Sequence, residues 1–185
     1  MPAPDPSAPS SPHPQISAGA LRLLLTGGSG FIGCRLAELA RSRGHAVTVL
    51  SAANNAVERQ RLERLARLGI RASLVALEDG PALLAALRGH EAVIHLAAAQ
   101  HEQAPESYFR RVNVEGTRRL LEAAASAGVR RFVHGSTIGV YGAAARDAAL
   151  DEDSPLAPDN PYGRTKADAE CVARAFSDRL EVVIT

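Results

Sequence analysis

Cysteine, aromatic residues and net charge are all scarce in this chain of 185 residues. Its two cysteines, Cys34 and Cys171, lie far apart in the sequence, which argues against a disulfide scaffold and against a cysteine-based metal site. We therefore expect small thiols in a reducing compartment and no bound metal. Aromatic residues make up only 4% of the chain, so its core has to be built mostly from Ala, Leu, Val and Ile.

The charge balance and the lack of long apolar runs restrict the partners. A formal net charge of +1 creates no field that would collect DNA or RNA. No apolar run reaches the roughly 18 residues of a membrane-spanning helix. The N-terminus also lacks the charged and then apolar pattern of a signal peptide. We expect a cytoplasmic protein with neither a nucleic-acid nor a membrane partner.

The chain divides into a tail and one domain. Residues 1–19 are rich in Pro, Ser and Ala and cannot bury enough apolar surface to offset their ordering entropy, so we predict a disordered tail. Residues 20–185 are sufficient for one domain with a real core, and too few for two.

Short apolar runs alternate with segments of helical periodicity from residue 21 onward. We predict strands over residues 21–26, 46–50, 70–77, 92–96, 131–135 and 181–185. We predict helices over residues 31–43, 57–68, 81–87, 112–127 and 162–179. Apolar strands that alternate with helices indicate a parallel sheet covered on both faces. With right-handed crossovers this is an α/β fold of the Rossmann type, a doubly wound parallel sheet.

A glycine-rich turn over residues 26–33, Thr-Gly-Gly-Ser-Gly-Phe-Ile-Gly, joins the first predicted strand to the first predicted helix. Gly27 permits a tight turn, Gly30 lets the backbone approach a pyrophosphate, and Gly33 lets the helix pack on the strand. The helix N-terminus adds unpaired N–H groups and a partial positive charge. A strand before the turn and a helix after it are the context that dinucleotide binding requires. The turn therefore predicts NAD or NADP as the cofactor.

The adenosine end of the predicted site lacks its usual acid. Ser51 stands at the end of the second strand, where Asp or Glu would bind the ribose of NAD. A site for NADP would accept a serine there but would need a nearby arginine, and Arg35 and Arg59 are the candidates. The sequence leaves the choice between NAD and NADP open.

Tyr162 and Lys166 lie one helical turn apart on the same face of the last predicted helix, and Pro161 places them at its start. A phenol with a pKa near 10 is a weak base at neutral pH, but a nearby ammonium and an oxidised nicotinamide both favour phenolate. Lowering that pKa by about three units takes about 4 kcal/mol. Tyr162 could then take the proton of a substrate hydroxyl while hydride passes to the nicotinamide.

Two further hydroxyls, Ser136 and Thr137, follow the fifth strand at its carboxyl end, where ligands bind in open parallel sheets. Thr137 could hold the same substrate oxygen as Tyr162. The alternative is that its hydroxyl only satisfies a local backbone group.

Five segments in order resemble the extended short-chain dehydrogenase/reductase family, the group of NAD-dependent sugar epimerases and dehydratases. They are residues 26–33, 93–98, 113–117, 136–142 and 161–166, and the resemblance runs from residue 21 to residue 185. It implies that Thr137, Tyr162 and Lys166 are catalytic and that Lys166 holds the nicotinamide ribose. It implies cofactor binding by Gly27, Gly30, Phe31, Ile32, Gly33, Ser51, Leu96, Ala97, Ala98, Ser136, Tyr162 and Lys166.

The resemblance also bears on two other polar residues and on assembly. Asn113 is similar to a family asparagine near the site, although a polar residue at a helix start is the alternative. We expect His95 to be a satisfied core residue and not a catalyst. The resemblance implies a small-molecule substrate and is compatible with helix-mediated homodimers.

Three departures from the family refine the expected function. Ala76 replaces an Asp that is often close to the adenine. Ile138 and Gly139 stand where sugar-nucleotide 4,6-dehydratases carry the Asp-Glu pair that performs elimination, so we expect an epimerase or a ketoreductase. The resemblance implies a small substrate domain after the sixth strand, and we expect this domain to be missing here. Two alternatives therefore stay open: a non-catalytic NAD(P)-binding module, and an incomplete enzyme fragment.

Overall fold

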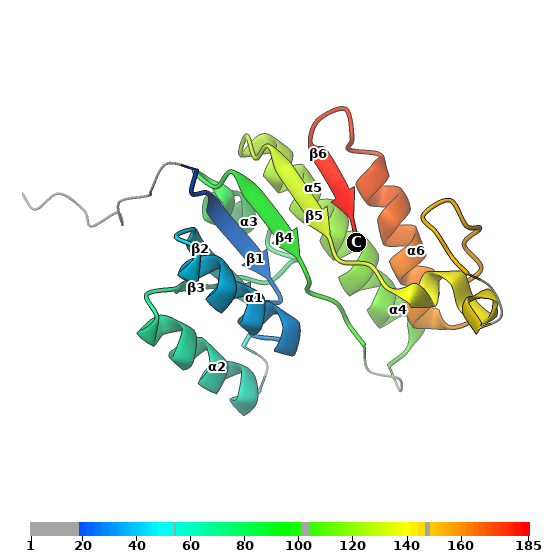
Figure 1. Ribbon diagram of the computed structural model, residues 1–185, viewed down its shortest axis with the longest axis horizontal. Helices are drawn as coiled ribbons and strands as arrows, with labels where there is room; N and C mark the ends of the chain where they lie inside the picture. The colour runs from blue at the N-terminus through cyan, green and yellow to red at the C-terminus, as the bar shows by residue number, and fades with distance from the viewer. Residues whose placement is uncertain (1–18, 54, 101–103, 147–148) are drawn as a thin grey trace, which may run out of the picture.

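The computed structural model describes residues 19–53, 55–100, 104–146 and 149–185 (Figure 1). The predicted tail, apart from Gly19, lies outside the described residues. None of the described helices combines the length and the apolar character that crossing a membrane would require.

Six parallel strands form one sheet, which confirms the predicted doubly wound architecture. The strands are β1 (Arg22–Thr26), β2 (Ala46–Ser51), β3 (Arg71–Leu74), β4 (Ala92–His95), β5 (Arg131–His134) and β6 (Glu181–Ile184). Their order in the sheet is β3-β2-β1-β4-β5-β6, and every neighbouring pair is parallel. The strand order reverses between β1 and β4, and such a switch point opens a crevice at the carboxyl ends of the strands.

Helices cover both faces of the sheet (Figure 1). They are α1 (Phe31–Ser42), α2 (Ala56–Arg67), α3 (Gly80–Leu87), α4 (Glu106–Phe109), α5 (Gly116–Ser126) and α6 (Pro161–Arg174). Successive residues of β1 serve opposite faces: Leu24 belongs to the core with α3, α5 and α6, and Leu25 belongs to the core with α1 and α2. Two apolar layers thus explain why the strands are apolar throughout.

Several predicted boundaries were wrong. The helix predicted over residues 112–127 is part of a longer helical run, in which the π-helical segment η1 (Arg110–Glu115) joins α4 to α5. A π turn breaks the period of 3.6 on which the prediction relied. The strand predicted over residues 70–77 and the helix predicted over residues 162–179 are both shorter. The 3-10 segment η2 (Ile138–Arg146) was not predicted; it bends at Gly142, whose φ is +59°.

Candidate functional site

A cavity of about 810 Å³ lies where the strands end at their carboxyl side. Segments that follow β1, β2, β3, β4 and β5 all contribute to its wall, as does the start of α6. All residues predicted to bind cofactor line it: Gly27, Gly30, Phe31, Ile32, Gly33, Ser51, Leu96, Ala97, Ala98, Ser136, Tyr162 and Lys166. Thr137 is not among the residues that line this cavity.

The glycine turn comes into close contact with the backbone after β4. Gly27 has a φ of +68°, and a Cβ placed there would lie 2.7 Å from the backbone nitrogen of Ala97. A Cβ on Gly33 would lie 2.3 Å from the Gly27 carbonyl oxygen, which itself accepts a hydrogen bond of 2.9 Å from the N–H of Gly30. Only a chain without side chains at these positions can form this tight cradle.

Gly28 is a position whose importance the sequence argument missed. A Cβ there would lie 2.5 Å from Cγ1 of Val49, in the middle of β2. The requirement for glycine at this position comes from packing on a neighbouring strand and is independent of phosphate binding. The spacing of the other glycines could not reveal it, because the contact is distant in sequence.

Ser51, at the end of β2, lines the cavity and forms hydrogen bonds with its own neighbours. Its hydroxyl lies 2.8 Å from the Ser29 hydroxyl and accepts a 3.0 Å hydrogen bond from the N–H of Ala53. The arginines proposed from the sequence do not line the cavity. Arg35 pairs with a carboxylate on its own helix, and Arg59 donates to the carbonyl oxygen of Ala53.

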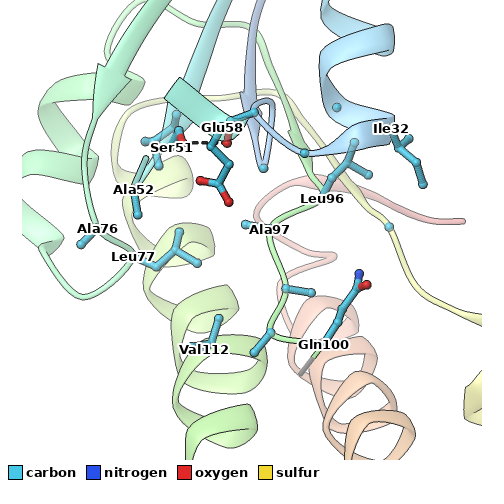
Figure 2. A pocket seen from close by; sticks show the side chains of 18 of the residues that line it. Ile32, Ser51, Ala52, Glu58, Ala76, Leu77, Leu96, Ala97, Gln100 and Val112 are labelled. Carbon is cyan, nitrogen blue, oxygen red and sulfur yellow. Dashed lines mark hydrogen bonds between the residues drawn. The ribbon is translucent and has the colours of Figure 1, made fainter. Parts of the chain in front are cut away.

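Glu58, which the sequence argument did not identify, lines the cavity instead. It lies in the first turn of α2, and Figure 2 shows its carboxylate pointing into the cavity between Ala52 and Ala97. The sequence does place an acid within one helical turn of Asn55, the residue that caps α2. Spacing alone cannot show that the side chain of this acid points into the cavity.

His95, at the end of β4, is a satisfied core residue, as predicted. Its Nδ1 lies 2.6 Å from the hydroxyl of Thr26, and its Nε2 lies 2.8 Å from the hydroxyl of Thr117. Burial above all, and then the proximity of His134 and of the Lys166 ammonium, holds the pKa of His95 well below its usual range. The neutral ring thus ties β4 to β1 and α5.

Asn113 fixes the loop after β4 to the helix that carries Tyr162. Its side chain accepts a hydrogen bond of 2.7 Å from the N–H of Ala99 and donates one of 3.2 Å to the carbonyl oxygen of the same residue. It also donates to the hydroxyl of Thr165, at 3.1 Å. It is buried inside the π-helical segment η1, and not at a helix start. Asn113 therefore positions cavity walls that come from two distant segments.

Lys166 is buried between β5 and the cavity. Its Nζ donates to the carbonyl oxygen of Gly135 at 2.5 Å and lies 3.2 Å from Nε2 of His134. Burial lowers the pKa of the Lys166 ammonium to about 8, against an opposing effect of the Glu170 carboxylate. Burial and the Lys166 charge lower the pKa of His134 to about 3, so that this ring is neutral and its Nε2 can accept a hydrogen bond from the Lys166 ammonium.

Tyr162 lies in the first turn of α6, which Asn160 caps by accepting a 2.8 Å hydrogen bond from the N–H of Gly163. The helix start approaches the backbone of η2, because a Cβ on Gly163 would lie 2.6 Å from the carbonyl oxygen of Gly139. Burial raises the pKa of Tyr162 in the chain without cofactor, and the Lys166 ammonium contacts Gly135 and His134. That Lys166 and an oxidised nicotinamide together lower the phenol pKa stays a prediction.

The two hydroxyls after β5 have different surroundings. The Ser136 hydroxyl donates to the buried carboxylate of Glu170, which also accepts from Arg174. The Thr137 hydroxyl accepts a hydrogen bond of 3.2 Å from the N–H of Gly139, which is the local alternative raised from the sequence. This bond uses an acceptor position of the hydroxyl and leaves its proton available for donation.

Over the described part of the chain, no group of three or more His, Cys, Asp or Glu residues could hold a metal ion.

Fold and cavity together define a Rossmann-type domain with its site at the switch point of the sheet. The chain belongs to the NAD dependent epimerase/dehydratase family, whose model matches residues 23–185.

Individual relatives agree with this assignment. The chain is 36% identical over 180 residues to a dTDP-glucose 4,6-dehydratase of Streptomyces niveus, with 89% of this chain and 52% of the relative covered. It is 34% identical over 153 residues to a 4-hydroxy-2-methyl-3-oxo-4-farnesyl-3,4-dihydroquinoline-1-oxide ketoreductase of Stigmatella aurantiaca, with 81% and 44% covered. The chain spans about half the length of the curated relatives it matches.

Among solved structures, the chain is similar to DesIV, a dTDP-glucose 4,6-dehydratase from Streptomyces venezuelae determined with NAD bound. The TM-score is 0.79 and the sequence identity is 39%, and the match covers 89% of this chain and 54% of DesIV.

Proposed function

We propose that this chain is the cofactor-binding part of an NAD(P)-dependent epimerase or ketoreductase that acts on a hydroxyl or keto carbon of a sugar-nucleotide-like substrate. The observation that carries the proposal is a single cavity bordered by the glycine turn, by the segment after β4, and by Tyr162 with Lys166. The similarity to an NAD-bound sugar-nucleotide enzyme and to a ketoreductase supports both parts of it.

The residues present fit a dinucleotide. The close approach of Gly27 and Gly33 forms a cradle that any side chain would fill, at the N-terminus of a helix of 12 residues. The backbone of Leu96, Ala97 and Ala98 lies along the same cavity. When bound, NAD(P) supplies the hydride acceptor and donor.

The roles of the side chains follow from the hydrogen bonds each can still make. Tyr162 takes the proton from the substrate hydroxyl, or returns it to the keto oxygen. Thr137 does not line the cavity, but its hydroxyl accepts the N–H of Gly139 and keeps a proton that it can donate to the same oxygen. Lys166 has three protons, of which Gly135 and His134 can accept two, so one remains for the nicotinamide ribose.

The cavity favours oxidation and reduction over elimination. Elimination of water needs an acid and a base at the substrate, and neither Ile138 nor Gly139 can act as either. Among the described residues, the carboxylates that line the cavity are Glu58 and Glu78, from α2 and from the connection after β3. Both belong to the part of the chain before β4, away from Tyr162 in the sequence.

A non-catalytic NAD(P)-binding module is the second candidate function. It is favoured by burial, which raises the pKa of Tyr162, and by Thr137, which does not line the cavity. In such a module the same cradle would bind cofactor, and no proton transfer would follow.

The Tyr162→Phe variant separates these functions. The chain and the variant would be titrated with NADH and NADPH by cofactor fluorescence and assayed on a panel of sugar nucleotides and ketones. We expect turnover to fall by a factor of roughly 100 to 10,000, with cofactor affinity nearly unchanged. Tyr141→Phe is the matched control, since Tyr141 does not line the cavity.

Equal loss of turnover and cofactor affinity in Tyr162→Phe would contradict the catalytic assignment. Cofactor binding without turnover on any substrate would favour the module. Aggregation of the chain, cured by additional sequence after Thr185, would favour an incomplete fragment.

A further inference from the structure

A carboxylate lines the cavity near the end of β2, although the strand itself does not end in an acid. β2 ends at Ser51, but Glu58 lines the same cavity from the first turn of α2. We infer that Glu58 binds the hydroxyls of the adenosine ribose and makes this site selective for NAD over NADP. This inference rests on the proposed function, because it assumes that the cavity binds a dinucleotide.

Local hydrogen bonds hold Glu58 in place. Its N–H donates to the side-chain oxygen of Asn55 at 2.9 Å, and its own carboxylate accepts from the Asn55 amide at 3.0 Å. The first bond caps the start of α2, and the second, from the Asn55 side-chain amide, holds the Glu58 side chain beside the cap residue. The contact with Asn55 orients the carboxylate, whose two oxygens offer about four acceptor positions, toward the cavity where the ribose hydroxyls would lie.

Ser51 contributes by shaping the turn and not by contacting ribose. It accepts the N–H of Ala53, and its hydroxyl lies 2.8 Å from that of Ser29 in the glycine turn. These bonds fold the segment after β2 back toward the glycine turn. Figure 2 shows the result: Ser51, Ala52 and the Glu58 carboxylate border the same part of the cavity.

The charges at this end of the cavity disfavour a 2′-phosphate. A carboxylate that accepts two hydroxyls of NAD would repel the two negative charges of the NADP phosphate. Arg59 donates to the Ala53 carbonyl oxygen, and Arg61 donates to the Ser29 carbonyl oxygen at 3.1 Å; neither lines the cavity. Of these two arginines, Arg61 is the better candidate for binding a 2′-phosphate, because it contacts the glycine turn.

The test measures the binding of NADH and NADPH separately, by fluorescence titration or calorimetry, in the unmodified chain and in Glu58→Gln. Gln keeps the cap, because the Asn55 side chain still accepts from the backbone N–H of residue 58, and its side-chain oxygen can still accept from the Asn55 amide. We expect the unmodified chain to prefer NADH. The variant should bind NADH roughly tenfold to a hundredfold more weakly and NADPH equally well or better.

Two further variants control for indirect effects. Glu63→Gln changes an exposed acid on the same helix and should leave both affinities unchanged. Adding Ser51→Asp to Glu58→Gln should recover much of the NADH affinity, because it returns a carboxylate to the strand end. A thermal melt shows that each variant is folded.

Unchanged NADH and NADPH affinities in Glu58→Gln would overturn the inference and leave the proposed function intact. A preference for NADPH that Arg61→Ala abolishes would overturn it in favour of phosphate recognition by Arg61. If the unmodified chain binds neither cofactor, the proposed function itself fails, and the assignment of Glu58 fails with it.

Discussion

Replacing Gly27 by alanine should destabilise the domain far more than the same change at another glycine of similar backbone conformation. Gly27 has a φ of +68°, and this left-handed region costs an alanine about 1–2 kcal/mol. Its Cβ would also lie 2.7 Å from the backbone nitrogen of Ala97 and 2.8 Å from the carbonyl carbon of Leu96. Relief of such crowding costs a further 1–3 kcal/mol, roughly. We expect Gly27→Ala to lose about 2–5 kcal/mol of the free energy of unfolding.

Gly44→Ala is the matched control for this prediction. Gly44 has a φ of +88°, and a Cβ there meets nothing within 4 Å, so only the backbone strain of about 1–2 kcal/mol applies. Urea denaturation of both variants gives the two losses of stability, and their difference measures the crowding at the cradle. Equal losses would refute the argument that contact with the segment after β4 requires glycine at position 27. Gly27→Ala should also weaken the binding of NADH, because the neighbouring backbone has to shift.

Two other perturbations test the buried polar groups around the cavity. The pKa of Lys166 falls from 10.5 to about 8 on folding, so between these pH values the unfolded chain binds more protons than the folded chain. The free energy of unfolding should therefore rise with pH over this range, by at most about 3 kcal/mol. Lys166→Met should flatten this rise in urea denaturation at pH 8 and pH 10, and an identical pH dependence would contradict the assigned burial effect. Asn113→Ala should lower the free energy of unfolding by about 2–4 kcal/mol, because it leaves the buried N–H and carbonyl of Ala99 unpaired. A loss below about 1 kcal/mol, measured in the same way, would mean that water replaces the side chain.

The fold could be predicted from the sequence because its signals are local. Apolar strands and the glycine turn before a helix each need only a few adjacent residues. The π-helical segment could not be predicted, because its widened turn leaves no distinct period. The bend at Gly142 was also missed, since its φ of +59° depends on how η2 packs.

Of the site residues predicted from the sequence, all except Thr137 line the cavity, but their interactions could be predicted only in part. Spacing placed Tyr162 and Lys166 on one helix face, and both line the cavity. It could not show that the amine of Lys166 contacts Gly135 and His134, because these come from a strand about 30 residues earlier in the chain. Glu58 was missed for a related reason: the usual position of the acid is a strand end, and here the acid comes from the following helix.

The contact between Gly163 and Gly139 has a consequence for how reaction types can diverge on this framework. Main-chain atoms set the spacing between the helix of Tyr162 and η2, so the position of the phenol does not depend on which side chains η2 carries. A Cβ on Gly139 would meet only Thr137, at 3.5 Å, which is an ordinary van der Waals distance. A side chain at position 139 therefore has room beside Thr137, and an acid or a base introduced there would change the groups next to that hydroxyl while the main-chain spacing between α6 and η2 is kept.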